Sequence, residues 1–350
     1  MAWYLAPMVP AALLSLSLQT LPVIQPSQQG SVKRDVSVGR VEVDAYVVDP
    51  KGNPIPDLLP SDFRVLVHGK PVRVESAEWV PADRPEAPPA LEPEDDKATE
   101  TTRQPLVLTP PGRLLVFLFQ THYERWRLPG LIRMAHEAVR YLDRMLPTDR
   151  VAVLSYDSRL KLRQDFTDDH ERLRRAIFDC LKFGLPGKAE ESPFPSLAAR
   201  WDYAAAKDAA SVDRGLSVLA RALEPLPGAK ALFFFGWGLR IDRSPRETRD
   251  LETAIADLYA ARTNMFMLDV SDADFHTLEI QLQAAADLTG GSYQKTHLFP
   301  QAAFDRVARS IAGRYVLVFE KPDYPGGAHP IDVELVGRKG RVMARTLYVD

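Results

Sequence analysis

The spacing of apolar and polar residues divides the chain into two kinds of region. Residues 35–81 alternate apolar with polar positions, in runs at Val41–Val48, Asp62–Val67 and Val72–Trp79. A period of two residues is typical of strands with one buried face. From residue 113 to about residue 313, unbroken apolar runs alternate with segments of helical period. Such alternation predicts a sheet of mostly parallel strands with helices on both faces.

The middle region, residues 113–313, is therefore expected to be a doubly wound α/β sheet. Its expected strands are buried runs and one edge strand: Leu114–Phe119, Arg150–Tyr156, Ala231–Phe235 and Asn264–Val270, with Leu160–Phe166 at the edge. Its expected helices are Leu128–Met145, Asp168–Phe183 (with Thr167 as N-cap), Tyr203–Leu223, Pro245–Arg262, Phe275–Leu288 and Phe304–Ile311.

The C-terminal segment returns to the two-residue period, at Arg314–Phe319, Ile331–Leu335 and Val342–Val349. Neither this segment nor residues 35–81 has enough strands to bury a core alone. We therefore expect residues 35–81 and 314–350 to form one small β-sandwich-like domain, with the middle region inserted between its two parts.

Two further segments lie outside these elements. Residues 82–112 are rich in proline and carry the acidic run Glu92–Asp96, which predicts a linker. Residues 1–30 contain the apolar run Ala11–Leu18 followed by polar residues, which is the pattern of a secretory signal peptide. The alternative is an uncleaved N-terminal anchor. We expect contact with a membrane only through this segment. The protein is thus expected outside the cytoplasm, either periplasmic or secreted.

The composition argues against some kinds of partner and of structural site, and it indicates no activity. A net charge of −3 gives no electrostatic reason to expect nucleic acid as a partner, since nucleic-acid-binding domains are usually strongly basic. The single cysteine, Cys180, excludes an intrachain disulfide and a cysteine-based metal cluster. Its amphipathic surroundings favour a buried, unreactive thiol. His276 and His297 are isolated in the sequence, and we expect core or surface roles for them.

The run Arg113–Glu124 contains the most informative residues of the chain. The buried strand Leu114–Phe119 is followed there by Gln120, His122 and Glu124. With the order of elements around it, this strand resembles the first strand of a von Willebrand factor A domain. In that family the strand ends in Asp-x-Ser-x-Ser, whose side chains hold a divalent cation.

The flanking segments resemble a narrower group, the acidobacterial VWFA-related domain family. The resemblance lies in Val43–Val65, Gly313–Phe319 and Val342–Val349. Together with the middle region it covers residues 35–350. It implies an exported protein with an A domain and no defined activity.

The metal site of the A-domain family is not reproduced in this sequence. Gln120, His122 and Glu124 stand at the Asp-x-Ser-x-Ser positions, and Trp237 stands where that family has Asp-Gly. The segment Ala199–Ala204 has no threonine where the family has one. Because a hard divalent cation needs several oxygen ligands in fixed geometry, we expect a degenerate site without a divalent metal, and no cofactor.

Ligands of open parallel sheets bind beyond the carboxyl ends of the strands. Large side chains that dominate protein interfaces are concentrated in the loops expected there. The candidate partner-binding residues are Trp126, Trp201, Trp237, Tyr123, Tyr203 and Arg240. We expect Trp126 and Trp201 to be exposed in the free protein. The alternative is that these aromatic side chains fill the space of the lost metal site.

Other residues offer weaker chemical signals at the same edge. His122 and Glu124 could be a metal pair, or a base with the residue that orients it. Asp269, Asp272 and Asp274 follow a strand and could gather a cation, although acids in this position usually cap helices.

The sequence therefore favours a non-enzymatic, extracytoplasmic protein-interaction or adhesion-type module that binds an unknown protein through a metal-free face. One alternative is a metal-assisted binder or hydrolase that uses His122, Glu124 and nearby acids. A structural spacer in an assembly is the other.

Overall fold

The computed structural model describes most of the chain beyond its N-terminal segment. The described residues are 39–83, 112–121, 125–182, 184, 186–193, 195–239 and 245–349, with the backbone alone for 245–248. The expected signal or anchor and most of the expected linker lie outside these residues. Within the described part of the chain, no helix is both long and apolar enough to cross a membrane.

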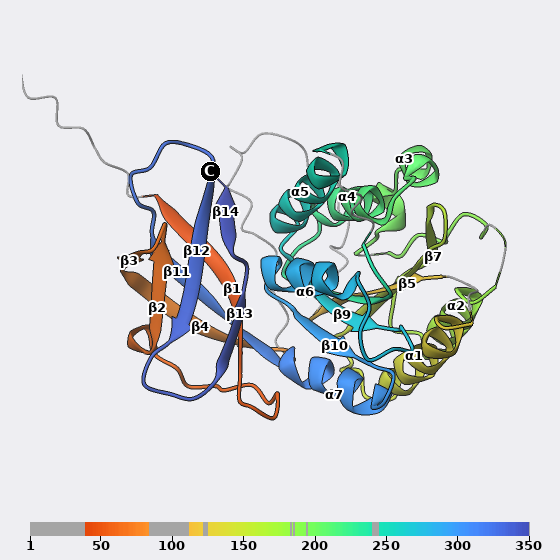
Figure 1. Cartoon of the computed structure of the whole chain (residues 1–350), viewed down its shortest axis with the longest axis horizontal. Coiled ribbons are helices and arrows are strands. Elements are labelled where there is room, and N and C mark those ends of the chain that lie inside the picture. The colour runs from red at the N-terminus through yellow and green to blue at the C-terminus, as the bar shows by residue number, and fades with distance from the viewer. Residues whose placement is uncertain are drawn as a thin grey trace, which may run out of the picture. The chain divides into compact units, whose positions relative to one another are not determined.

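A six-stranded sheet forms the middle region, with strands in the order β10-β9-β8-β5-β6-β7 (Figure 1). The strands are Ser292–Lys295 (β10), Thr263–Asp269 (β9), Lys230–Gly236 (β8), Leu114–Gln120 (β5), Arg150–Tyr156 (β6) and Leu160–Thr167 (β7). Neighbouring strands are parallel except β6 and β7, which form an antiparallel pair. The predicted mostly parallel α/β sheet is confirmed.

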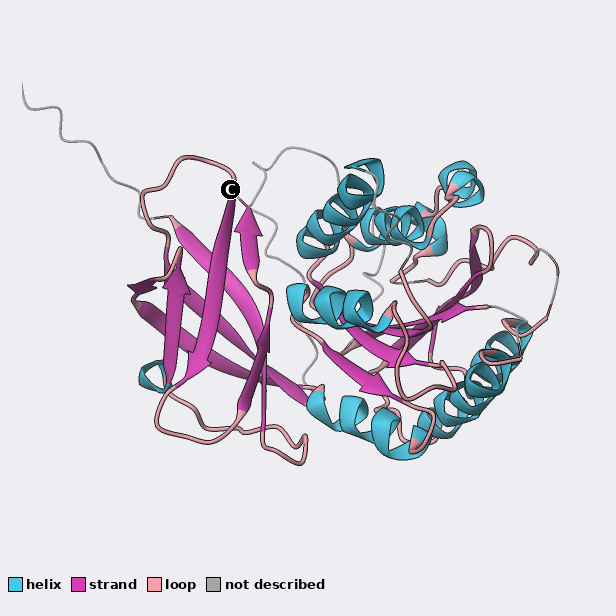
Figure 2. Ribbon diagram, in the orientation of Figure 1, coloured by secondary structure: helices cyan, strands magenta, loops and turns pink. Residues whose placement is uncertain are grey.

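Helices cover both faces of this sheet (Figure 2). One face packs on α3 (Tyr203–Asp208), α4 (Val212–Leu223), α5 (Pro245–Ala260) and α6 (Glu279–Leu288), and the other on α1 (Leu128–Leu142), α2 (His170–Asp179) and α7 (Pro300–Ser310). Successive residues of a strand point to opposite faces. Val116 and Leu118 therefore belong to one hydrophobic cluster, and Phe117 and Phe119 to the other. This burial on both faces explains the unbroken apolar run of β5.

The helix predicted over Tyr203–Leu223 is wrong in one respect, because the chain breaks it into α3 and α4. Ser211 begins α4 as its N-cap, and its hydroxyl accepts a hydrogen bond from the Arg214 amide. The Tyr156 hydroxyl donates to the Ala209 carbonyl at 3.2 Å. These local and tertiary hydrogen bonds replace those of a continuous helix.

The N-termini of two other helices also differ from the prediction. Asp169, and not Thr167, caps α2, because its carboxylate accepts from the Glu171 and Arg172 amides. A carboxylate is the better cap at a helix N-terminus. Helix α6 begins at Glu279, so Phe275–Leu288 is not helical throughout. The short strand β10 was not predicted.

The remaining strands form two four-stranded antiparallel sheets, β13-β1-β11-β4 and β14-β12-β2-β3. They are Arg40–Val48 (β1), Phe63–Val67 (β2), Lys70–Val72 (β3), Val74–Pro81 (β4), Gly313–Glu320 (β11), Ala328–Leu335 (β12), Arg341–Ala344 (β13) and Leu347–Val349 (β14). Strands from the two ends of the described chain pair directly, β1 and β4 with β11, and β2 with β12.

Side chains of these two sheets share hydrophobic clusters. Val43 of β1, Val65 of β2 and Ile331 of β12 belong to one of them. The segment Val342–Val349, predicted as one strand, is two strands, because the chain passes from one sheet to the other between β13 and β14. Short 3-10 turns at Pro60–Asp62 (η1) and Ala198–Arg200 (η2) complete the described elements.

Candidate functional site

The carboxyl ends of β5 and β8 are joined by the side chain of Gln120. Its amide nitrogen donates to the Gly238 carbonyl at 2.8 Å. Its amide oxygen accepts from the Trp237 and Gly238 amides at 2.8 and 3.2 Å. Because Gln120 is buried, these bonds satisfy polar groups that water does not reach. The side chain at the first expected metal position is therefore turned toward the backbone of the neighbouring loop.

The backbone after β8 is packed closely around this amide. A Cβ at Gly236 would lie 2.1 Å from the Phe234 ring and 2.7 Å from the Gln120 oxygen. A Cβ at Gly238 would lie 2.6 Å from a methyl group of Leu278. Real Cβ atoms do not approach this closely, so both positions require glycine. The close packing leaves the Gln120 side chain enclosed at this point of the edge.

Trp126 and Trp237 have very different environments. Trp237 is half-buried and packs on the hydrophobic cluster below the loop. The Arg127 guanidinium lies 3.6 Å from its ring centre, within the range of a cation–π contact. Trp126 is 56% exposed, with the Arg125 guanidinium 4.3 Å from its ring centre. Trp126 is therefore accessible, as predicted, and Trp237 is partly a packing residue.

Asp269, at the end of β9, is buried in a hydrogen-bonded network. Its carboxylate accepts from the Tyr293 hydroxyl at 2.7 Å and from the Ser271 amide at 2.9 Å. His276 Nε2 lies 2.7 Å from the same carboxylate, so His276, for which a core or surface role was expected, has an acidic partner. Burial and the charge of Asp269 both raise the pKa of the Tyr293 hydroxyl. The network fixes the loop after β9 to β10.

The three acids of this loop do not converge. Asp272 pairs with Arg133 at 3.1 Å, and Asp274 pairs with His297 at 3.1 Å, while Asp269 is held in its own network. Among the described residues, no group of three His, Cys, Asp or Glu side chains is placed to hold a metal ion. His122, Tyr123, Glu124 and Arg240 lie outside the described residues.

Five large apolar side chains are exposed on the segments at and near the ends of β9 and β10. They are Trp126, Phe275, Ile280, Leu298 and Phe299, and we call them the β9–β10 patch. Phe275 is 66% exposed and Phe299 is 71% exposed. Where exposed apolar side chains are contiguous on a soluble protein, they often mark an interaction surface.

Polar contacts connect the segments that carry this patch. His297 and the Lys295 ammonium both contact Asp274, so the loops after β9 and β10 are joined. The Asp272 amide donates to the Trp126 carbonyl at 3.0 Å, which joins the segment before α1 to the same loop. The patch residues therefore lie on connected segments at one part of the carboxyl edge.

Trp201 and Tyr203 lie at a different place, beside the edge strand β7. They line a cavity of about 430 Å³ together with Leu160 and Leu162. Tyr203 is 41% exposed, whereas Trp201 is only 7% exposed and belongs to the hydrophobic core. The expectation that Trp201 is exposed is wrong, because its indole packs with the buried side chains of β7. The predicted aromatic residues thus do not form one surface.

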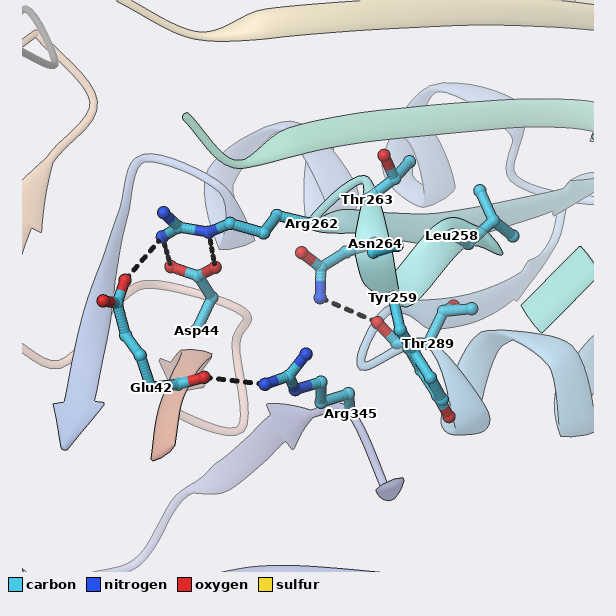
Figure 3. Close-up of a pocket in the computed structure, with 10 residues that line it drawn as sticks. Glu42, Asp44, Leu258, Tyr259, Arg262, Thr263, Asn264, Thr289 and Arg345 are labelled. Carbon is cyan, nitrogen blue, oxygen red and sulfur yellow. Dashed lines mark hydrogen bonds and ion pairs between the residues drawn. The ribbon is translucent and has the colours of Figure 1, made fainter. Parts of the chain in front are cut away.

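A second cavity lies at the opposite, amino-terminal end of β9 (Figure 3). Arg262 donates to both carboxylate oxygens of Asp44, at 2.9 and 3.0 Å, and Arg314 donates to one of them at 2.9 Å. Glu42 also pairs with Arg262, at 3.1 Å. Burial raises the pKa of Asp44, but Arg314 and Arg262 outweigh it and hold the pKa below its usual value. The network attaches β1 to the turn between α5 and β9.

No protein-family model matches this chain, and no curated protein matches it. Among solved structures it is similar to a von Willebrand factor type A protein from Catenulispora acidiphila, with 11% identity and a TM-score of 0.41 over 68% of this chain and 67% of that one. A mutant of the PilB minor pilin from Streptococcus sanguinis has 11% identity and a TM-score of 0.39 over 60% of this chain. That match spans 63% of the pilin, which is less than two thirds of its length.

The conserved hypothetical protein BatB from Bacteroides thetaiotaomicron is also similar, with 9% identity and a TM-score of 0.38 over 57% of this chain and 99% of that one. Similarity at this distance transfers no activity and no partner.

Four patch residues, Phe275, Ile280, Leu298 and Phe299, were not among the sequence-predicted candidates. Phe275 was assigned to a helix, and Leu298 and Phe299 lie in a loop after a strand that was not predicted. A usable signal was present in the sequence for Phe275 alone, since this aromatic residue follows the predicted strand Asn264–Val270.

Proposed function

We propose that this protein is a non-enzymatic, extracytoplasmic interaction module of adhesion type, built on a von Willebrand factor A-like domain with a degenerate metal site. In this proposal residues 113–313 form that domain, inserted in a β-sandwich-like domain made by residues 35–81 and 314–350. The relationship to the acidobacterial VWFA-related family is part of the same proposal. The extracytoplasmic location rests on the apolar N-terminal segment of the sequence.

The β9–β10 patch is the observation that carries this function. Its aromatic and aliphatic side chains are of the kind that supply most of the binding energy in protein interfaces. Trp126 was predicted as a contact, and Phe275 and Phe299 extend the surface. The Asp269 network fixes the loop after β9, so the patch is presented on a preorganised edge.

A capture experiment with three baits tests the role of the patch. The baits are the wild-type protein, the double variant Phe275→Ser with Phe299→Ser, and the control Leu59→Ser, which removes a 63% exposed apolar side chain next to η1. We expect a protein from the native envelope fraction to be retained by the wild type and by the control and lost with the double variant. Equal retention by all three baits would remove the patch from the interface and favour the structural-spacer alternative.

We propose that no divalent cation binds at the end of β5, because the amide of Gln120 is enclosed there. We expect Mg²⁺, Mn²⁺ or Ca²⁺ to leave the melting temperature within experimental error. A site occupied at about 1,000 times its dissociation constant would instead stabilise the fold by about 4 kcal/mol. A saturable rise in melting temperature would favour the alternative of a metal-assisted binder or hydrolase using His122 and Glu124. Differential scanning fluorimetry across a metal titration measures this.

A further inference from the structure

The cavity beside β7, here called the β7 cavity, combines an apolar interior with a rim of positive charge. Its interior is formed by Leu160, Leu162, Trp201 and Ala206, which are all buried. The half-exposed ring of Tyr203 stands at the entrance. A volume of about 430 Å³ is within the range of small-ligand sites, which are mostly apolar with a few polar groups.

Basic side chains line this cavity, and none of the described residues that line it is acidic. They are Arg159, Lys161, Lys188 and Lys207. Lys161 forms an ion pair with Asp157. The Lys188 ammonium lies 3.5 Å from a carboxylate oxygen of Glu191. The protein as a whole carries a net charge of −3, so this concentration of cations is a local feature and not a consequence of general basicity.

The charges of Arg159 and Lys207 are not balanced at the cavity. Within the described ranges of the chain, neither side chain forms an ion pair with a carboxylate, unlike Lys161 and Lys188. Lys207 is exposed on α3 and Arg159 precedes β7, so the two cations approach the cavity from different elements. Two cations beside an apolar cavity complement an anionic group attached to an apolar body.

The geometry points to the β7 cavity as a binding site for an aromatic or aliphatic carboxylate. The apolar body of the ligand packs against Trp201 and Leu160, and its carboxylate accepts hydrogen bonds from Arg159 and Lys207. A free organic acid and the C-terminal residue of a polypeptide both present this chemistry. This site is separate from the β9–β10 patch and does not depend on the proposed function.

Calorimetric titration with three probes tests the site on the full chain. The probes are phenylacetate, the peptide Ala-Ala-Ala-Phe with a free C-terminal carboxylate, and the same peptide with a C-terminal amide. We expect at least one carboxylate probe to bind saturably with a dissociation constant below about 1 mM, as suits a ligand of this size. Binding of the peptide acid alone identifies a chain terminus as the source, and binding of phenylacetate alone a free acid.

Substitution of the basic residues tests whether the probes bind in the β7 cavity. We expect the double variant Arg159→Gln with Lys207→Gln to weaken binding by about tenfold or more, because it removes two charge-assisted hydrogen bonds. The control Lys182→Gln removes a cation whose side chain is 71% exposed and pairs with Asp179 outside the cavity, and should bind as the wild type does. Tyr203→Ala should weaken the aromatic probes without lowering the melting temperature, because its ring is exposed.

Two results would overturn the assignment. One is the absence of saturable binding by both carboxylate probes. The other is a loss of discrimination. This would be seen if the peptide acid and its amide bind with equal affinity, or if the double variant binds a carboxylate probe as tightly as the wild type does. The variant Phe275→Ser with Phe299→Ser should bind the probes normally, so failure of this site and failure of the proposed interaction surface are separable.

Discussion

At the scale of single residues, Gln120 determines the structure of the carboxyl edge. An amide can donate and accept at once, and Gln120 uses both properties toward Trp237 and Gly238. A carboxylate at this position could only accept, and would leave the Gly238 carbonyl without its donor. The amide thus connects the end of β5 to the loop after β8.

Removal of this amide should destabilise the protein measurably. We expect Gln120→Ala to lower the free energy of unfolding by about 3 kcal/mol, because it leaves buried backbone groups without hydrogen-bond partners. Urea denaturation measures the change. The control Gln164→Ala removes an amide that donates to a single, adjacent carbonyl, that of Asp165, and should cost less than about 1 kcal/mol. Equal costs for the two variants would contradict the role assigned to Gln120.

At the scale of elements, the loops and the edge strand β7 place the predicted aromatic residues at two separate positions on the middle region. The loop after η2 brings Trp201 against β7, where it is buried, while the segment before α1 leaves Trp126 in solvent. Both residues lie in loops between predicted elements. Their place in a loop does not tell which side chain is buried and which is exposed. The distinction comes from packing, because Trp201 joins the hydrophobic cluster that contains Leu160 and Leu162 of β7, whereas Trp126 does not.

This difference predicts opposite effects of the same substitution. Trp201→Ala should lower the free energy of unfolding by about 3–5 kcal/mol, as truncation of a buried aromatic side chain does. Trp126→Ala should change it by less than about 0.5 kcal/mol, because the side chain is exposed. Thermal and urea unfolding of the two variants provide the comparison. A large loss of stability in the Trp126 variant would show that it packs against the protein and is not available to a partner.

At the scale of the whole molecule, one acid with a 10% exposed side chain connects the terminal strands to the middle region. Asp44 of β1 is held by Arg262, before β9, and by Arg314 of β11. Strand β1 also places Tyr46 and Val48 in the hydrophobic cluster of the six-stranded sheet. The contact between the two regions is therefore both apolar and ionic within the described chain.

The lowered pKa of Asp44 predicts a contribution to stability that depends on pH. The group is more acidic in the folded protein than in the unfolded chain, where its pKa is about 3.9. Its contribution is complete above that pH and is lost as the pH falls through the folded-state value. Asp44→Asn should cost about 3 kcal/mol at neutral pH, because it removes the anionic partner of the buried Arg314 guanidinium and one of the partners of the part-buried Arg262. The variant should also lose less stability than the wild type on acidification.

Glu42→Gln is the matched control for this prediction. Glu42 lines the same cavity and pairs with Arg262, but its side chain is 53% exposed. Exposed ion pairs contribute about 0–1 kcal/mol, so the control should be nearly as stable as the wild type. If Asp44→Asn is equally stable at pH 7, the ionic contact does not hold the two regions together.

The local pattern of the sequence was sufficient for most elements. The unbroken apolar runs of β5, β6, β8 and β9 require burial on both faces, and the period of α1 requires one apolar side. These signals depend on neighbouring residues alone, so they survive without knowledge of the fold. The break between α3 and α4 could not be predicted from neighbouring residues alone. The Tyr156 hydroxyl, which comes from strand β6, contributes to it.

The tertiary structure alone decided which side chains share a site. The positions of Gln120, Trp126 and Trp237 beyond strand ends follow from the alternation of strands and helices. The burial of Trp201, the exposure of Phe275 and Phe299, and the meeting of Asp44 with Arg262 depend on contacts between residues far apart in the chain. Apolar and charged residues have the same local pattern whether they face a partner, a cavity or the core, and only packing determines which of these they meet.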